Sequence, residues 1–340
     1  MVTVRDVAKL AGVAPITVSR VVNNAPGVNS ITHKRVTQAI AELHYVPNAM
    51  AKSLRSSKTH TIALVLTDVT NPFWTTLVRG VEDTAAKQDY HVILCNTDEN
   101  PEKEANYISI LLQRRVDGIL LAPSTQDKQR LISLKHHNIP CVLVDRKVNG
   151  FKSDIVRSDS LEGARALTEH LIALGHHRIA IVVGPTGIST ADERLAGYRQ
   201  ALQSHGIAID DRLVKQGSYK QDKSDQFVKE LLALEPRPTA IIATNNFMGI
   251  GVLQSLRESE ILVPDEMALV CFDDIPQASL IYPFLTVCAQ DAYKMGVMAT
   301  ELLLERITSK SVRRKSREIV LGIELIIRKS SGQQLTKRVG

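Results

Sequence analysis

Residues 4–23 read VRDVAKLAGVAPITVSRVVN, and this stretch predicts two short helices joined by a tight turn. Apolar residues recur from Val4 to Ala11 at the three- and four-residue spacing of one helix face. Gly12 is typical of a helix end, and Pro15 suits the first turn of a second helix that we expect to run to about Asn23. The pattern is that of a helix-turn-helix.

The rest of the N-terminal segment supports a small helical module that binds a polyanion. A third helix is predicted from about Thr32 to Leu43, capped by Asn29 or Thr32. Residues 1–60 carry eight Lys/Arg against two acidic residues, whereas the remainder carries 34 of each sign. Such asymmetry is expected where one module meets nucleic acid. A three-helix bundle that binds another protein is the alternative, and the charge excess disfavours it.

In a helix-turn-helix the second helix enters the major groove of DNA. Arg20 can donate two hydrogen bonds to a guanine, whereas Pro15 and Ile16 could only contact thymine methyl groups or respond to shape. Thr3 can cap the first helix. The DNA-binding residues predicted in this module are Thr3, Pro15, Ile16, Thr17, Ser19, Arg20, Asn23 and Thr32.

The overall amino-acid composition is that of an ordinary globular protein. The 340 residues are 44% hydrophobic and 23% charged. Because the four cysteines are scattered and form no CxxC motif, we expect structural thiols, no metal site and no cofactor. No apolar run approaches the ~20 residues of a membrane span, and the first residues lack the apolar core of a secretory signal. These features favour a cytoplasmic protein.

After a short polar linker, apolar strands alternate with helices, which predicts parallel sheets in two α/β lobes. Helices are expected at 74–88, 103–114, 161–174 and 193–205. Strands are expected at 61–67, 91–95, 118–122, 141–144, 179–183, 240–243 and 267–272.

Polar residues follow several of these strands, where open α/β sheets bind ligands. Carboxylates, amides, two arginines and aromatic rings suit a polyhydroxylated ligand. Asp145 and Asp273 could instead cap helices, and Arg194 could be a structural ion-pair partner. The strand-end residues are Asp68, Asn71, Phe73, Trp74, Asp145, Arg146, Asp192 to Arg194, Asn245, Asn246, Asp273 and Asp274.

Residues 4–13 and 17–23, together with ELHYVPNAMA at 42–51, closely resemble the LacI/GalR family of transcriptional regulators, and the resemblance continues along almost the entire chain. It implies an all-α helix-turn-helix domain over 1–47, a hinge helix and linker over 48–60, an α/β effector-binding and dimerisation core over 61–330, and a polar tail over 331–340. It places lobe 1 at about 61–160 plus 292–322 and lobe 2 at about 161–291 plus 323–330, with three crossovers.

The same resemblance implies a hinge helix that enters the minor groove, with Leu54 as an apolar wedge between bases. Asn48, Ala51 and Lys52 are the further DNA-binding residues expected there. The chain departs from the family at Ala14, where Ser is frequent, and at Pro15. The operator preference of a relative therefore does not transfer.

The resemblance also extends to ribose-type periplasmic binding proteins, and it implies an effector site. A pentose, hexose or sugar derivative is favoured over a purine, although two arginines could pair with an acidic sugar. Asn246 replaces the Asp usual after the family's Asn. The implied effector-binding residues are Asp68 (from its strand-end position), Asn71, Phe73, Trp74, Asp145, Arg146, Arg194, Asn245, Phe272, Asp273 and Gln290.

The resemblance thus implies a homodimeric repressor of a carbohydrate-use operon, which binds two-fold symmetric DNA and is switched by a sugar-like effector. In some family members the effector releases the protein from DNA, and in others it promotes DNA binding. The sequence is compatible with both responses. A transport-type sugar-binding protein would lack the basic helix-turn-helix. An enzyme would need a positioned acid/base pair or metal, and no motif here demands one.

Overall fold

The computed structural model describes residues 2–46, 58–219, 223–309 and 315–332. The chain divides into two compact units, Met1–Thr59 and His60–Gly340.

The first unit is a three-helix module. Its helices are α1 (Val4–Ala11), α2 (Pro15–Val22) and α3 (Ser30–Glu42). Val7, Val18 and Val36, one from each helix, are fully buried together. Gly12 ends α1 in the left-handed conformation with φ +60°, as expected of a glycine C-cap. Helix α3 begins two residues before the predicted start because Asn29 caps it, accepting a hydrogen bond from the Thr32 backbone N–H at 2.7 Å.

Lobe 1 of the second unit is built on a six-stranded parallel sheet of order β11-β5-β4-β3-β1-β2. Its strands are β1 (Thr61–Leu66), β2 (His91–Asn96), β3 (Gly118–Leu121), β4 (Cys141–Val144), β5 (Asp154–Ser158) and β11 (Glu318–Leu321). The helices of this lobe are α5 (Pro72–Ala86), α6 (Pro101–Gln113), α7 (Ile132–His136) and α13 (Ala292–Thr308), with a 3₁₀ turn at Lys128–Leu131.

Lobe 2 has a six-stranded sheet of order β12-β10-β9-β8-β6-β7, in which only the β10–β12 pair is antiparallel among the described strands. Its strands are β6 (Ile179–Val183), β7 (Val214–Gln216), β8 (Ala240–Ala243), β9 (Ala268–Phe272), β10 (Thr286–Gln290) and β12 (Ile323–Ile326). Its helices are α8 (Ser160–Ala173), α9 (Ser189–Ser204), α10 (Ser224–Leu232), α11 (Asn246–Glu258) and α12 (Pro276–Ile281), with 3₁₀ turns at Asp211–Leu213 and Lys329–Ser331.

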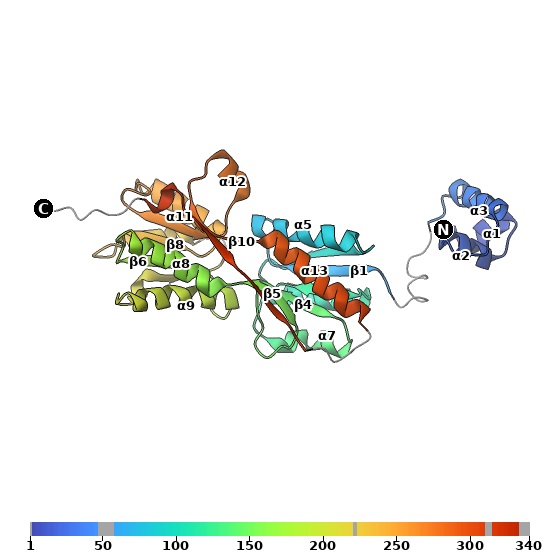
Figure 1. Cartoon of the computed structure of the whole chain (residues 1–340), viewed down its shortest axis with the longest axis horizontal. Helices are drawn as coiled ribbons and strands as arrows, with labels where there is room; N and C mark the ends of the chain where they lie inside the picture. The colour runs from blue at the N-terminus through green and yellow to red at the C-terminus, as the bar shows by residue number, and fades with distance from the viewer. Residues whose placement is uncertain (1, 47–57, 220–222, 310–314, 333–340) are drawn as a thin grey trace. The chain divides into compact units, whose positions relative to one another are not determined.

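The chain passes between the two sheets three times: after β5, after β10 and between β11 and β12. The last crossing is the long red segment of Figure 1. Helices α5 and α13 pack closely in lobe 1, where a side-chain atom at Gly80 would lie 2.2 Å from the Tyr293 carbonyl oxygen.

The predicted fold class, a helix-turn-helix module plus a two-lobed α/β core, is confirmed. All seven predicted strands form, each within one residue at either end. The sequence pattern did not predict β5, β7, β10, β11 and β12. These strands are three to five residues long and several carry charged side chains, such as Glu318 and Glu324, so their apolar pattern is weak. None of the helices described is long and apolar enough to cross a membrane.

Candidate functional site

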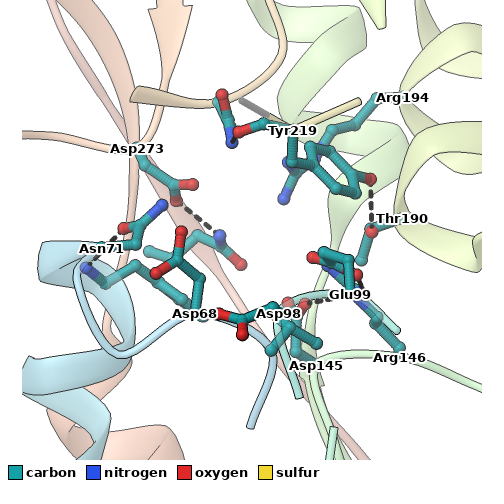
Figure 2. Close-up of a pocket in the computed structure, with 14 residues that line it drawn as sticks. Asp68, Asn71, Asp98, Glu99, Asp145, Arg146, Thr190, Arg194, Tyr219 and Asp273 are labelled. Atoms are coloured by element: carbon teal, nitrogen blue, oxygen red, sulfur yellow. Dashed lines mark hydrogen bonds and ion pairs between the residues drawn. The ribbon is translucent and has the colours of Figure 1, made fainter. Parts of the chain in front are cut away.

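A polar pocket lies between the two lobes of the core, at the carboxyl ends of the strands of both sheets (Figure 2). It has a volume of about 490 Å³, part of which is open to solvent. Lobe 1 contributes Thr67, Asp68, Asn71, Phe73, Asp98, Glu99, Asp145 and Arg146, and lobe 2 contributes Thr190, Arg194, Tyr219, Asn245, Asp273 and Gln290.

The lobe 1 wall near α5 is shaped by two local turns after β1. Asp68 accepts hydrogen bonds from the backbone N–H and hydroxyl of Thr70, at 2.9 and 2.6 Å. Asn71 caps α5, with its Oδ1 accepting from the Phe73 N–H at 2.9 Å. These bonds hold Asp68, Asn71 and Phe73 at the pocket.

Arg146 and Asp145 follow β4 in the floor of lobe 1. Arg146 donates from Nη1 and Nη2 to the two carboxylate oxygens of Glu99, at 2.6 and 2.7 Å. Burial would lower the pKa of Arg146, but the charge and hydrogen bonds of Glu99 raise it. The pKa of Asp145 is raised because burial outweighs the neighbouring charges of Arg146 and Arg194.

Helix α9 carries the lobe 2 residues Thr190 and Arg194 one turn apart, so both face the pocket. The Arg194 guanidinium lies 3.7 Å from the centre of the Phe272 ring and donates to the Thr244 carbonyl oxygen at 2.6 Å. The Thr190 and Tyr219 hydroxyl oxygens are 3.0 Å apart. The predicted helix over 193–205 already contained Arg194, and α9 begins four residues earlier than expected, at Ser189.

Three further groups complete lobe 2. Asn245 caps α11 through the Met248 N–H at 2.8 Å and donates to the Tyr219 carbonyl oxygen at 3.0 Å. Asp273 accepts from Gln290 Nε2 at 2.6 Å. Burial raises the pKa of Asp273 to about 6, although Arg194 and the Gln290 hydrogen bond act in the opposite direction.

Several buried polar atoms around the pocket have no hydrogen-bond partner among the described residues. Two are donors, Nε of Arg146 and Nε of Arg194, and two are acceptors, Oδ1 of Asp145 and Oε1 of Gln290. The fifth is the Thr67 hydroxyl, which can both donate and accept. Buried polar groups in native proteins are normally paired. A ligand whose groups both donate and accept, such as a polyol, could satisfy both kinds.

The lobes also touch directly through two amides. Asn71 Nδ2 donates to Asn246 Oδ1 at 2.8 Å, and Asn246 Nδ2 donates to Asn71 Oδ1 at 3.0 Å. Each Oδ1 also accepts a backbone N–H, from Phe73 and Phe247 respectively, which defines the orientation of both amides. Asn246 therefore joins the two lobes and is not among the residues that line the pocket.

Nine of the eleven predicted effector residues line the pocket. Trp74 and Phe272 do not. Trp74 is the third residue of α5, and its side chain packs in the lobe 1 core. Phe272 packs against the Arg194 guanidinium in the lobe 2 core. The aromatic rings at the pocket are Phe73 and Tyr219. Asp145 and Asp273 both have positive φ and neither is a helix cap, which excludes that alternative for them.

Five lining residues were missed: Thr67, Asp98, Glu99, Thr190 and Tyr219. Asp98 and Glu99 follow β2, so the strand-end rule would have found them. Tyr219 follows β7, which is too short to recognise from its pattern. Where the structure describes the chain, it groups no three His, Cys, Asp or Glu residues so that they could hold a metal ion.

The helix-turn-helix module presents most of its predicted residues on the surface. Thr3, Pro15, Ile16, Arg20 and Asn23 are exposed, and Thr17, Ser19 and Thr32 are partly exposed. The Thr3 hydroxyl donates to Asp6 Oδ2 at 2.7 Å, and Asn23 Nδ2 donates to the Ser19 carbonyl oxygen at 2.7 Å. The predicted hinge residues Asn48, Ala51, Lys52 and Leu54 lie outside the described residues.

A basic helix-turn-helix unit and a two-lobed core with a polar inter-lobe pocket define an effector-responsive regulator of transcription. Residues 3–48 match the family model of bacterial regulatory proteins, lacI family. Residues 59–329 match the model of periplasmic binding proteins and sugar binding domain of LacI family. The chain belongs to the LacI family, whose members are regulators rather than enzymes.

Individual relatives agree with this placement. The ribose operon repressor of Escherichia coli (strain K12) is 37% identical over 316 residues, which cover 93% of this chain and 96% of that protein. The HTH-type transcriptional repressor PurR of Haemophilus influenzae (strain PittEE) is 36% identical and covers 97% of this chain and 98% of its own length.

Solved structures give the same result. The Lac repressor dimer bound to operator and the anti-inducer ONPF has a TM-score of 0.83 at 28% identity, covering 97% of this chain and 99% of that one. A LacI family regulator from Enterococcus faecium with bound ribose has a TM-score of 0.71 at 30% identity, covering 81% of this chain and 100% of that one.

Proposed function

We propose that this protein represses genes of carbohydrate use, and that a neutral sugar bound between its lobes changes its affinity for operator DNA. The observation that carries the sugar assignment is the set of unpaired buried donors and acceptors around the pocket. Arg146 and Arg194 offer Nε–H groups, whereas Asp145 and Gln290 offer oxygens. Sugar hydroxyls can pair with both, and the Phe73 and Tyr219 rings can cover the C–H faces of a sugar ring.

A second candidate ligand is a purine, because PurR is among the relatives. The pocket favours a sugar, since five carboxylates line it and hydroxyl groups are good donors to carboxylates. The bound ribose of the Enterococcus faecium regulator and the cellobiose of a regulator described as a CelR–cellobiose complex agree with this choice.

The DNA-binding half of the proposal assigns the exposed face of α2 to the major groove. Arg20 would read a base, and the exposed Pro15 and Ile16 would contact thymine methyl groups or respond to shape. The hinge, with Leu54 as the proposed minor-groove wedge, would set the distance between two modules. DNA binding implies that the protein works in the cytoplasm.

We propose a homodimer that matches a two-fold operator, and the similar Lac repressor structure is a dimer bound to operator. Three neighbouring apolar side chains of lobe 2 are strongly exposed: Leu280 (88%), Ile281 (87%) and Tyr282 (59%). Contiguous exposed apolar side chains mark interaction surfaces. A second copy of this surface is the proposed occupant.

The proposed division of labour follows the expected boundaries: 1–47 binds DNA, 48–60 forms the hinge and linker, 61–330 binds the effector and dimerises, and 331–340 is a tail. Effector binding would alter how the lobes are held relative to each other and hence how well the two DNA-binding modules fit the operator. Coupling between two such sites is typically ~1–3 kcal/mol.

The test has two parts. A thermal-shift screen against sugars, sugar acids, sugar phosphates and purines should identify a neutral sugar, because a ligand at 100 times its Kd stabilises a protein by ~2.7 kcal/mol. Operator fragments selected from random DNA should then bind with an affinity that this sugar changes at least about fivefold.

Arg194→Ala should abolish the sugar response and leave DNA binding of the sugar-free protein intact. Stabilisation by purines alone would show that the effector is a purine instead of a sugar, and it would leave the assignment as a repressor unchanged. Operator affinity that is the same with and without a bound ligand would refute the proposed switch.

A further inference from the structure

Glu99 was not among the sequence-predicted residues, yet it lies at the centre of the pocket's charge arrangement. It belongs to the loop between β2 and α6, and its carboxylate faces Arg146 at the floor of the pocket (Figure 2). The loop places two consecutive non-glycine residues, Asp98 and Glu99, at φ +54° and +60°. Left-handed residues of this kind persist where the surroundings hold them.

The loop is held by charges and by the next helix. Asp98 accepts from Lys103 Nζ and from Asn96 Nδ2. Asn100 caps α6 by accepting from the Glu102 and Lys103 N–H groups at 2.8 and 3.1 Å. The backbone on either side of Glu99 is therefore held by these neighbours, and its carboxylate is held by Arg146.

The Glu99 carboxylate pairs with the two Nη groups of the Arg146 guanidinium. The two Nη groups donate to its two oxygens at 2.6 and 2.7 Å, and Nη1 also donates to the Pro123 carbonyl oxygen at 3.2 Å. Arg146 is only 4% exposed, and its Nε lies 3.6 Å from Asp145 Oδ2. This paired geometry is the one by which an arginine would hold the carboxylate or phosphate of a ligand.

The second arginine is partly engaged within lobe 2. Arg194 lies over Phe272 and donates to the Thr244 carbonyl oxygen. The described lining holds five carboxylates (Asp68, Asp98, Glu99, Asp145 and Asp273) and only these two arginines. An anionic ligand would enter a pocket with more carboxylates than arginines, and to pair with the Nη groups of Arg146 it would have to displace Glu99.

Building on the proposed sugar site, we infer that Glu99 is the residue that restricts the effector to uncharged sugars and excludes sugar acids and sugar phosphates. Its carboxylate adds negative charge to the floor and takes the hydrogen bonds that Arg146 would otherwise give to an anion. Each Glu99 oxygen keeps a second lone pair, which can accept a sugar hydroxyl. The side chain thus favours a hydroxyl where a carboxylate or phosphate would be repelled.

The test uses matched ligands that differ in charge: glucose with glucuronate, galactose with galacturonate, and ribose with ribose 5-phosphate, plus inorganic phosphate. Thermal shift and calorimetric titration compare the full-length wild type with Glu99→Gln, which removes the charge and preserves size. We expect the anions to stabilise Glu99→Gln but not the wild type. The affinity ratio of anionic to neutral ligand should rise at least about 10-fold.

Two controls separate charge from general damage. Glu102→Gln removes a carboxylate three residues away that pairs with Arg130 outside the pocket, and it should leave the ratio unchanged. Glu99→Asp keeps the charge and should continue to exclude anions. If Glu99→Gln does not fold by circular dichroism, Glu99→Ala removes the same charge and leaves room for water around Arg146.

The outcomes are distinct. A wild type that binds an anion at least as tightly as its neutral counterpart overturns the inference, as does a folded charge-removed variant that gains no anion response. A wild type that responds to no neutral sugar overturns the proposed ligand class. If no neutral sugar binds, comparing anion binding to the wild type and to Glu99→Gln still tests whether Glu99 excludes anions.

Discussion

Single residues in the pocket combine charge with burial, and Asp273 is the clearest case. Its carboxylate faces Arg194 and Gln290, with Asp145 contributing a like charge from the other lobe. Burial raises its pKa to about 6. Effector binding is therefore expected to depend on pH.

We expect the affinity for the sugar to rise with pH through about 6. Hydroxyl donors favour the ionised carboxylate, so binding lowers the pKa of Asp273 and releases a proton. The Kd should fall up to about tenfold between about pH 5 and about pH 7.5 and then level off. Calorimetric titration across this range provides the measurement. Asp273→Asn should have a much flatter profile, and an unchanged slope in that variant would contradict the assignment.

At the scale of elements, the turn between α1 and α2 depends on one glycine. Gly12 has φ +60°, and a Cβ there would lie 2.7 Å from Nη2 of Arg35. That same Nη2 donates to the carbonyl oxygens of Ala11 and Gly12. The glycine therefore allows both the backbone turn and the contact between α1 and α3.

Gly12→Ala should destabilise the helix-turn-helix module by about 1–2 kcal/mol, through left-handed strain and displacement of Arg35. Hydrogen exchange of peptides from α1 and α2 in the full chain should become about five- to thirtyfold faster. Gly27→Ala is the matched comparison, because Gly27 also has positive φ but a Cβ there would meet no heavy atom of the described residues within 4 Å. No measurable effect of Gly12→Ala would contradict this role of the glycine.

At the scale of the whole molecule, two features concern assembly and the relation between lobes. The amides of Asn71 and Asn246 join the N-terminal ends of α5 and α11 across the pocket. The exposed apolar side chains at α12 lie on lobe 2. Both can be tested without knowing the effector.

The amide pair should appear as coupling in a double-mutant cycle. Asn71→Ala and Asn246→Ala each leave a buried amide without its partner, whereas the double variant removes both. The double variant should be less destabilised than the sum of the single variants by about 1 kcal/mol, measured by urea unfolding. Asn106→Ala, on the exposed face of α6, is the control. Strict additivity would argue against an energetic link between the lobes here.

The α12 surface should be needed for dimer formation. Ile281→Asp places a charge on a side chain that is 87% exposed in the single chain, so it should yield a folded monomer in sedimentation velocity. Ile110→Asp, at an apolar residue of α6 that is 40% exposed, should leave the assembly unchanged. A dimer that persists in the Ile281 variant would place the interface elsewhere.

The sequence alone determined the class of the protein, its two kinds of domain and most of the pocket. Two local signals carry this information: the apolar periodicity around Gly12 and Pro15, and the alternation of strands with helices. The strand-end rule then uses the predicted strands to list the positions that face a ligand. That route correctly located Asp68, Asn71, Asp145, Arg146 and Asp273 at the pocket.

The tertiary structure decided what those side chains do, because their partners are distant in the sequence. Arg146 meets Glu99 across 47 positions, and Asn71 meets Asn246 across 175. Tertiary packing also decides which aromatic rings line the pocket. Trp74 and Phe272 pack in the cores of the two lobes, whereas Tyr219 lines the pocket. Local pattern predicts elements, whereas charge pairing and burial arise only when distant elements meet.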